Sequence, residues 1–135
     1  IRILGTDIGI GAVEQAKTAA FGTRAMHLVP EDYRRRFFIK GRQADVWQAR
    51  PVLTEMMTFR QHNLLDPLHE KPFDLVVLKN VLIYFSQPSK ASALRNIRTA
   101  LKPGGLLLVG AAEGVAELLR DFHRIEPWLY RKPAA

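Results

Sequence analysis

The segment Phe73–Leu78 is almost uninterrupted in its apolar character and is rich in valine and leucine. A short apolar run without alternation predicts a strand buried on both faces, as in a parallel sheet that helices cover. Lys79 and Asn80 follow this run, and the apolar residues 81–85, which include Tyr84, come next. Because ligands bind beyond the carboxyl ends of the strands in open α/β sheets, Lys79 and Asn80 are candidates for a binding site. An ordinary solvated turn is the alternative.

Apolar patterns along the rest of the chain predict an α/β order of strands and helices. Strands are expected at residues 1–4, 59–65 and 106–109, helices at 10–20, 91–101 and 115–119, and an antiparallel pair of strands at 125–126 and 128–131. Gly22 is expected to end the first helix, and Ser86 is expected to cap the helix that follows the central strand. Residues 21–29 are expected to form a loop, after which Pro30 begins a short helix.

A different pattern occupies residues 37–60. Short strand candidates at 37–40, 45–48 and 57–60 are separated by turn-like or polar residues, and Gly41 marks the first turn. This arrangement predicts a small antiparallel unit inserted into the α/β body. The turn-like residues 102–105 are expected to separate the second long helix from the strand at 106–109.

The formal net charge of +7 favours acidic partners. Basic residues concentrate in and beside the insert, at Arg34, Arg35, Arg36, Lys40, Arg42, Arg50 and Arg60, against Asp45 and Glu55. This segment could dock an acidic partner, or it could be a solvated surface. Nucleic-acid binding is not expected, because the basic residues are not interleaved with aromatic side chains as in a groove for single strands.

Composition excludes several other classes of function. Cysteine is absent, so disulfides and thiolate metal sites are excluded, and the four histidines lack the spacing of zinc ligands. No metal site is therefore expected. No apolar run approaches the ~20 residues of a membrane span, so membrane insertion is not expected. A cytoplasmic location fits these features.

Two further segments have the chemistry to bind a nucleoside. Asp7 lies near the end of the first predicted strand, where a carboxylate can accept hydrogen bonds from both hydroxyls of a ribose. The alternative is that Asp7 caps the next helix. Residues 63–65, Asn-Leu-Leu, combine an amide with a flat apolar pair, which suits the edge and faces of an adenine. A turn before Pro67 is the alternative there.

The order of these motifs resembles the chemotaxis-receptor methyltransferase family (CheR-type). The segments that carry the resemblance are Gly-Thr-Asp-Ile at 5–8, Asn-Leu-Leu at 63–65, Phe-Asp-Leu-Val at 73–76, Lys-Asn-Val-Leu-Ile-Tyr-Phe at 79–85, Leu-Lys-Pro-Gly-Gly-Leu at 101–106 and Gly-Ala-Ala-Glu at 110–113. The resemblance covers essentially the whole chain, and residues 80–85 are its most specific part. It implies a Rossmann-like α/β methyltransferase sheet, mostly parallel with an antiparallel C-terminal strand, and a small inserted antiparallel β-subdomain at 37–60.

The resemblance also implies an activity and a set of site residues. The family transfers a methyl group from S-adenosylmethionine to glutamate side chains of chemotaxis-type receptors, leaving S-adenosylhomocysteine. The cofactor-binding positions it implies are Asp7, Ile8, Asn63, Leu64, Lys79 and Asn80. Tyr84 and Lys79 are the implied catalytic residues. The basic segment 34–60 is the implied contact with the cytoplasmic region of the receptor.

The sequence departs from the family pattern at two internal places. Lys79 stands where the family usually has arginine, and a lysine lacks the planar bidentate fork of that residue. Ala111 and Ala112 replace a His-Ser pair. An alternative reading is therefore a non-catalytic methyltransferase-like module that senses cofactor or docks a signalling protein.

The third departure concerns the start of the chain. The family's first strand, its glycine-containing cofactor loop and an N-terminal helical domain would all precede Ile1, so residues 1–135 are expected to be part of a methyltransferase domain. The first strand would lie between the strands at 1–4 and 73–78 and leave both with an unpaired edge. Unpaired buried backbone groups cost roughly 1–3 kcal/mol each, against a total domain stability of ~5–15 kcal/mol. We therefore expect these residues alone to be unstable, or to recruit another strand, and to bind S-adenosylmethionine poorly.

Overall fold

The computed structural model describes residues 1–42 and 45–134. The chain divides into two compact units, an N-terminal unit (Ile1–Asn63) and a C-terminal unit (Leu64–Ala135). Each unit contains its own pair of parallel strands. No helix of the described residues is long and apolar enough to cross a membrane.

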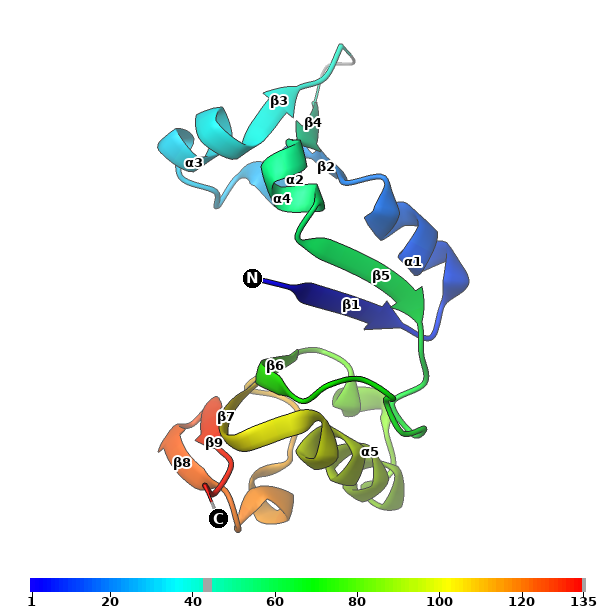
Figure 1. Cartoon of the computed structure of the whole chain (residues 1–135), viewed down its shortest axis with the longest axis vertical. Coiled ribbons are helices and arrows are strands. Elements are labelled where there is room, and N and C mark those ends of the chain that lie inside the picture. The colour runs from blue at the N-terminus through cyan, green and yellow to red at the C-terminus, as the bar shows by residue number, and fades with distance from the viewer. Residues whose placement is uncertain (43–44, 135) are drawn as a thin grey trace. The chain divides into compact units, whose positions relative to one another are not determined.

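In the N-terminal unit, β1 (Ile3–Asp7) pairs in parallel with β5 (Met57–Gln61), so that Gly5 lies opposite Phe59. α1 (Ile10–Lys17) packs against both strands (Figure 1). The pairing of β5 with β1 corrects one expectation, because residues 57–60 do not belong to the antiparallel unit. Their alternation of half-buried and exposed residues suits either sheet, and only the partner strand distinguishes the two.

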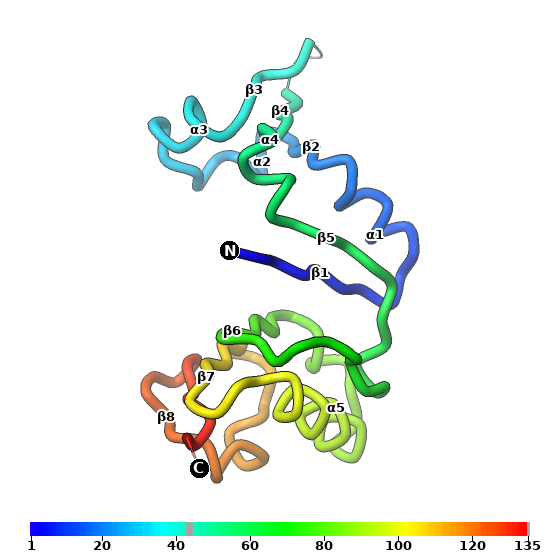
Figure 2. The backbone as a smooth tube through the Cα atoms, viewed as in Figure 1, coloured from blue at the N-terminus to red at the C-terminus, as the bar shows by residue number. Residues whose placement is uncertain are grey.

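The antiparallel sheet has the order β2 (Ala20–Gly22), β4 (Val46–Ala49), β3 (Phe38–Lys40). The chain leaves α1 through β2 and returns through β4 and α4 (Pro51–Thr54) to β5 (Figure 2). Between β2 and β3 lie α2 (Thr23–Met26) and α3 (Glu31–Phe37). The rings of Phe21 and Phe38 meet edge to face, with centroids 5.8 Å apart, and help to hold this small sheet together.

The predictions for residues 18–26 are wrong, whereas residues 27–29 lie in turns as expected. α1 ends at Lys17, Ala19 adopts a left-handed φ of 51°, and the next residues form β2 instead of a last helical turn and a loop. Gln48 on β4 supplies the physical reason, because its Nε2 donates a hydrogen bond of 2.8 Å to the carbonyl oxygen of Thr18. That bond satisfies a carbonyl at the helix end while Ala20 pairs with Gln48 in the sheet.

The C-terminal unit is a four-stranded sheet in the order β6-β7-β9-β8. β6 (Phe73–Leu78) and β7 (Leu101–Val109) are parallel, and β9 (Leu129–Arg131) and β8 (His123–Glu126) continue the sheet in antiparallel fashion. The connections carry the 3-10 turns η1 (Leu82–Tyr84) and η2 (Ala116–Leu119) and the long helix α5 (Gln87–Ala100). The antiparallel C-terminal pair agrees with the prediction.

One apolar core holds the C-terminal unit together. Its buried members come from both parallel strands, α5, the two 3-10 turns and the last strand β9, and include Leu78, Leu82, Leu94, Ile97, Leu107 and Tyr130. Ser86 caps α5 as predicted, since its Oγ accepts a hydrogen bond of 3.3 Å from the Ser89 N–H. At the other end of the helix, Lys132 Nζ donates hydrogen bonds of 2.7 Å to the carbonyl oxygens of Arg98 and Leu101.

Two expectations for this sheet are corrected. β7 begins at Leu101, and residues 102–105, which were predicted to form a turn, belong to the strand. The pairing with β6 shifts register in this stretch, where Gly104 has a φ of 74°. β6 is not buried on both faces, since Leu75 and Val77 are 49% and 59% exposed. Side chains alternate across a strand, and only the face of Val76 and Leu78 packs on the core.

Among the described strands, β5 is the only partner of β1 and β7 is the only partner of β6. Each of these two strands therefore has one edge that no described strand occupies. The order of a complete sheet around them stays a prediction.

Candidate functional site

In the N-terminal unit, Asp7 is the last residue of β1 and is exposed. Its Oδ1 accepts a hydrogen bond of 2.8 Å from the Gly9 N–H, at the residue that precedes α1. Gly9, and not Asp7, occupies the N-cap position of α1, so the capping alternative is not observed and the contact is a local one before the helix. The other oxygen has no hydrogen bond to the described residues, so an exposed acceptor remains at the strand end.

The residues beside Asp7 are fixed by the end of β5. Gln61 Nε2 donates a hydrogen bond of 2.7 Å to the Ile8 carbonyl, and the His62 N–H donates one of 2.9 Å to the Asp7 carbonyl. Asn63 lies one residue further along and is half-buried. Asp7, Ile8 and Asn63 therefore gather where the parallel strands β1 and β5 end.

In the C-terminal unit, Lys79 and Asn80 directly follow β6 and are both exposed. Asn80 has a φ of 59°, in the left-handed region that asparagine tolerates better than most residues. The turn lies against the residue that follows β7, because a Cβ on Gly110 would be 3.3 Å from Lys79 Cγ and 3.5 Å from the Asn80 nitrogen. The carboxyl ends of β6 and β7 thus meet closely, and Gly110 leaves room for the turn.

Leu64 and Tyr84 complete the predicted residues of this unit. The Leu64 carbonyl accepts a hydrogen bond of 3.0 Å from Asn96 Nδ2 on α5, and the Leu64 side chain packs on the core. Tyr84 is 84% exposed at the end of η1, although Leu82, two residues before it, is fully buried. The tyrosine hydroxyl therefore stands on an anchored turn and remains accessible.

The sequence pattern indicated no role for Glu113, which lies in the loop after β7. Glu113 is fully buried, and its Oε1 accepts a hydrogen bond of 3.3 Å from the Val81 N–H. Its Oε2 has no hydrogen-bond partner among the described residues. The available sequence signal was an acidic residue three positions after Gly110, at the carboxyl end of a buried strand.

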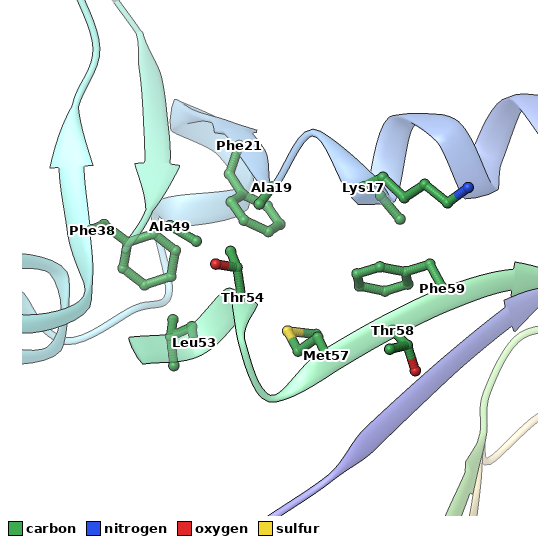
Figure 3. Close-up of a pocket in the computed structure, with 11 residues that line it drawn as sticks. Lys17, Ala19, Phe21, Phe38, Ala49, Leu53, Thr54, Met57, Thr58 and Phe59 are labelled. Atoms are coloured by element: carbon green, nitrogen blue, oxygen red, sulfur yellow. The ribbon is translucent and has the colours of Figure 1, made fainter. Parts of the chain in front are cut away.

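Other features of the molecule lie away from these residues. Figure 3 shows an apolar pocket of about 520 Å³ in the N-terminal unit, lined by Phe21, Phe38, Leu53, Met57, Phe59 and their neighbours. None of the predicted site residues is among the described residues that line it. At the amino ends of β6 and β7, Lys102 donates a hydrogen bond of 2.7 Å to the exposed Asp74 and lowers the pKa of that carboxyl. No cluster of possible metal ligands occurs among the described residues.

The parallel pairs, the helices between strands and the antiparallel C-terminal strands are features of the Rossmann-like class of α/β domains. The N-methyltransferase NodS from Bradyrhizobium japonicum WM9 has a similar fold, with a TM-score of 0.52 and 15% sequence identity over 98% of this chain and 74% of that one. At this identity the similarity concerns the fold alone. It agrees with the predicted fold class.

Residues 1–128 match the family described as CheR methyltransferase, SAM binding domain, and the chain belongs to this family. The chemotaxis protein methyltransferase of Listeria innocua serovar 6a is 35% identical over 84% of this chain and 42% of its own length. Chemotaxis protein methyltransferase 1 of Pseudomonas aeruginosa is 36% identical over 93% of this chain and 46% of its own length. The chain thus spans less than half the length of these relatives. The family match confirms the predicted family and the predicted cofactor, S-adenosylmethionine.

The backbone at Asn80 generates a first prediction. Replacing Asn80 with valine, whose branched side chain is strained at positive φ, should lower the free energy of unfolding by about 1–3 kcal/mol. Replacing it with glycine should leave stability close to that of the wild type, because glycine adopts this conformation freely. Urea unfolding of the natural full-length gene product measures both variants. Equal losses in the two variants would show that the amide, and not the backbone conformation, stabilises the turn.

Proposed function

We propose that this chain is the S-adenosylmethionine-binding domain of a protein-glutamate O-methyltransferase that acts on the cytoplasmic region of chemotaxis-type receptors. The family match over residues 1–128 carries the proposal. The exposure of Asp7, Lys79, Asn80 and Tyr84 at or beyond strand ends supports it, because each can reach a ligand. Residues 1–135 would form part of that domain, in a cytoplasmic protein, with the antiparallel sheet of β2, β4 and β3 as its inserted subdomain.

The donor chemistry needs few catalytic groups. When bound, S-adenosylmethionine supplies a methyl group on a positively charged sulfur, which departs as a neutral thioether. A glutamate side chain is already ionised at neutral pH, so no general base is required. The task of the protein is to align the carboxylate with the methyl group.

Tyr84 and Lys79 are the residues proposed for this alignment. The exposed Tyr84 hydroxyl can donate a hydrogen bond that orients the incoming carboxylate. Lys79, also exposed, can attract the carboxylate by its charge. A lysine here offers a point charge in place of a planar fork, so the orientation would depend more on Tyr84.

The residues proposed to bind the cofactor are Asp7, Ile8, Asn63, Leu64, Lys79 and Asn80. The observed geometry fits this role at Asp7, whose carboxylate keeps one acceptor exposed after its contact with Gly9. It also fits at Lys79 and Asn80, because Gly110 has no side chain and leaves room for their turn beside the end of β7. A non-catalytic module that senses cofactor or docks a partner is the second candidate, and Ala111 and Ala112 favour it.

The basic segment 34–60 is the proposed contact with the receptor. Arg34 makes contacts within the unit. Its Nε donates a hydrogen bond of 3.0 Å to the Val29 carbonyl, and its guanidinium lies 6.0 Å from the Trp47 ring centre. Within the described part of the chain, Arg35 has only a loose ion pair of 3.8 Å with Glu31, and both Arg35 and Arg42 are exposed. These two arginines can therefore meet an acidic surface without disturbing the sheet.

For Asp7, we predict that replacement with alanine weakens binding of S-adenosylhomocysteine by on the order of 1.5–3 kcal/mol, because charge-assisted hydrogen bonds to the ribose are lost. Asp7→Asn should keep the hydrogen bond from Gly9 and still lose affinity, which separates ligand binding from this local contact. Calorimetry on the natural full-length gene product measures both. Glu14→Ala, at an exposed ion pair with Lys17, is the control and should not change affinity. Unchanged affinity in both Asp7 variants would refute the assignment.

For Tyr84, we predict that replacement with phenylalanine lowers the rate of receptor methylation and leaves cofactor affinity nearly intact. The reason is that the hydroxyl would touch the glutamate and not the cofactor. The assay uses the full-length gene product, radiolabelled cofactor and receptor cytoplasmic fragments, and it also separates an enzyme from a non-catalytic module. Tyr33→Phe, on α3, is the control for loss of a tyrosine hydroxyl. A variant that loses cofactor affinity but keeps its turnover at saturating cofactor would contradict this role.

For the basic segment, we predict that Arg35→Glu with Arg42→Glu slows association with the receptor, and that added salt weakens wild-type binding. Arg124→Glu with Arg131→Glu, at two exposed arginines on β8 and β9, is the matched control for the change in net charge. Surface plasmon resonance at several salt concentrations measures the association rate. Association that is as fast in the basic-segment variant as in the control would remove the segment from the interface.

Some family members also bind a receptor's C-terminal peptide through a longer glycine-containing loop in this subdomain. The loop near Gly41 and Arg42 is short, and Gln43 in it lies outside the described residues. We therefore expect no tight complex with such a peptide, and the same binding assay tests this.

A further inference from the structure

Two charged side chains are buried in the described part of the chain, and both contact the same loop. Glu113 is fully buried and Lys90 is 8% exposed. They do not form an ion pair with each other among the described contacts. Lys90 Nζ instead donates a hydrogen bond of 2.8 Å to the Glu113 backbone carbonyl, and Glu113 Oε1 accepts one of 3.3 Å from the Val81 N–H.

These hydrogen bonds attach both ends of one segment to a single residue. The segment runs from residue 81 to residue 90 and contains η1, Tyr84 and the cap of α5. The side chain of Glu113 holds its first residue, and the backbone carbonyl of Glu113 holds the side chain of its last residue. The loop that carries Glu113 is itself tied down, because the Glu113 N–H donates to the Gly110 carbonyl at 3.3 Å.

Few hydrogen bonds hold the segment near Tyr84. A 3-10 turn of three residues has few of its own, and here the Tyr84 N–H donates to the Val81 carbonyl at 3.4 Å and the Phe85 N–H donates to the Leu82 carbonyl at 3.0 Å. Val81, Leu82 and Phe85 pack on the core, whereas Tyr84 is 84% exposed and lies outside that packing. The direction of the exposed tyrosine therefore depends on how the two ends of the segment are held.

Stability alone does not account for buried charges of this kind. Burial of an ionised group disfavours folding unless the group is well paired, and apolar residues of similar volume are often as stable or more stable. Glu113 keeps one oxygen without a partner among the described residues, so its burial is incompletely compensated. A need to hold residues 81–90 in one position would explain why both side chains are buried here.

We propose that Glu113 and Lys90 are positioning residues for methyl transfer, which hold both ends of the segment 81–90 so that Tyr84 is presented in one orientation. The inference rests on the proposed function of Tyr84. Neither side chain touches substrate in this scheme. They act by hydrogen bonds to the turn after β6 and to the loop after β7.

The test compares four variants of the natural full-length gene product. Glu113→Gln retains a carbonyl oxygen for the Val81 N–H, whereas Glu113→Met removes the acceptor at similar length. Lys90→Met removes the donor at similar length. Glu117→Met, at an exposed glutamate on η2, is the matched control.

We expect Glu113→Met and Lys90→Met to lower kcat for receptor methylation on the order of 10- to 100-fold, because misplacement of an aligning group has effects of this size. Glu113→Gln and the control should stay near wild-type kcat, and all folded variants should keep the wild-type KM for the receptor. Amide hydrogen exchange at Val81 should be faster in Glu113→Met and unchanged in Glu113→Gln. A merely structural role would not give this pattern of rescue by glutamine.

Several results would overturn the proposal. A wild-type kcat in Lys90→Met would show that Lys90 is not a positioning residue. A Glu113→Gln variant as slow as Glu113→Met would show that Glu113 does not act as the acceptor for the Val81 N–H. If Glu113→Met does not fold, Lys90→Met and Glu113→Gln still decide. If the wild type itself does not methylate receptors, the proposed function fails, whereas exchange at Val81 and the side-chain order of Tyr84 by NMR still test the attachment of the segment.

Discussion

The parallel pairing of β6 with β7 is the interaction on which the candidate site of the C-terminal unit depends. Parallel strands bring their carboxyl ends to the same edge of a sheet, so the residues that follow β6 meet the residues that follow β7. Lys79 and Asn80 come from the first strand, and Gly110 and Glu113 come from the second. Their closeness is a property of the sheet and needs no contact between residues that are near in sequence. The same rule brings Asp7 and His62 together in the N-terminal unit.

Much of the C-terminal unit could be predicted from the sequence because its signals are local. A serine before Gln87 and Pro88 predicts the start of α5, and the apolar runs predict β6 and the second half of β7. The same holds for the final pair of strands. These elements are long, periodic or bounded by residues with a strong conformational preference.

The errors occur where a partner distant in sequence decides the structure. Ala20–Gly22 is good helix or loop sequence, and it becomes a strand because β4, beyond α2 and α3, pairs with it. Residues 57–60 have the pattern of a strand in either sheet, and β1 decides between them. Leu75 and Val77 are apolar but exposed, because burial depends on what covers a face and not on the strand itself. Glu113 was missed for a related reason, since its partners Val81 and Lys90 are 32 and 23 residues away in sequence.

The space at Gly110 has an evolutionary consequence. A side chain there would meet Glu113 Oε1 at 3.1 Å, Lys79 Cγ at 3.3 Å and the Asn80 nitrogen at 3.5 Å. Residues in such contact give mutational effects that do not add. The turn after β6 and the loop after β7 should therefore change together in natural sequences. A substitution in one should be tolerated only with particular residues in the other. In a randomised library this coupling would appear as epistasis between positions 79–81 and 110–113, and single-site scans would underestimate the sequences that the site accepts.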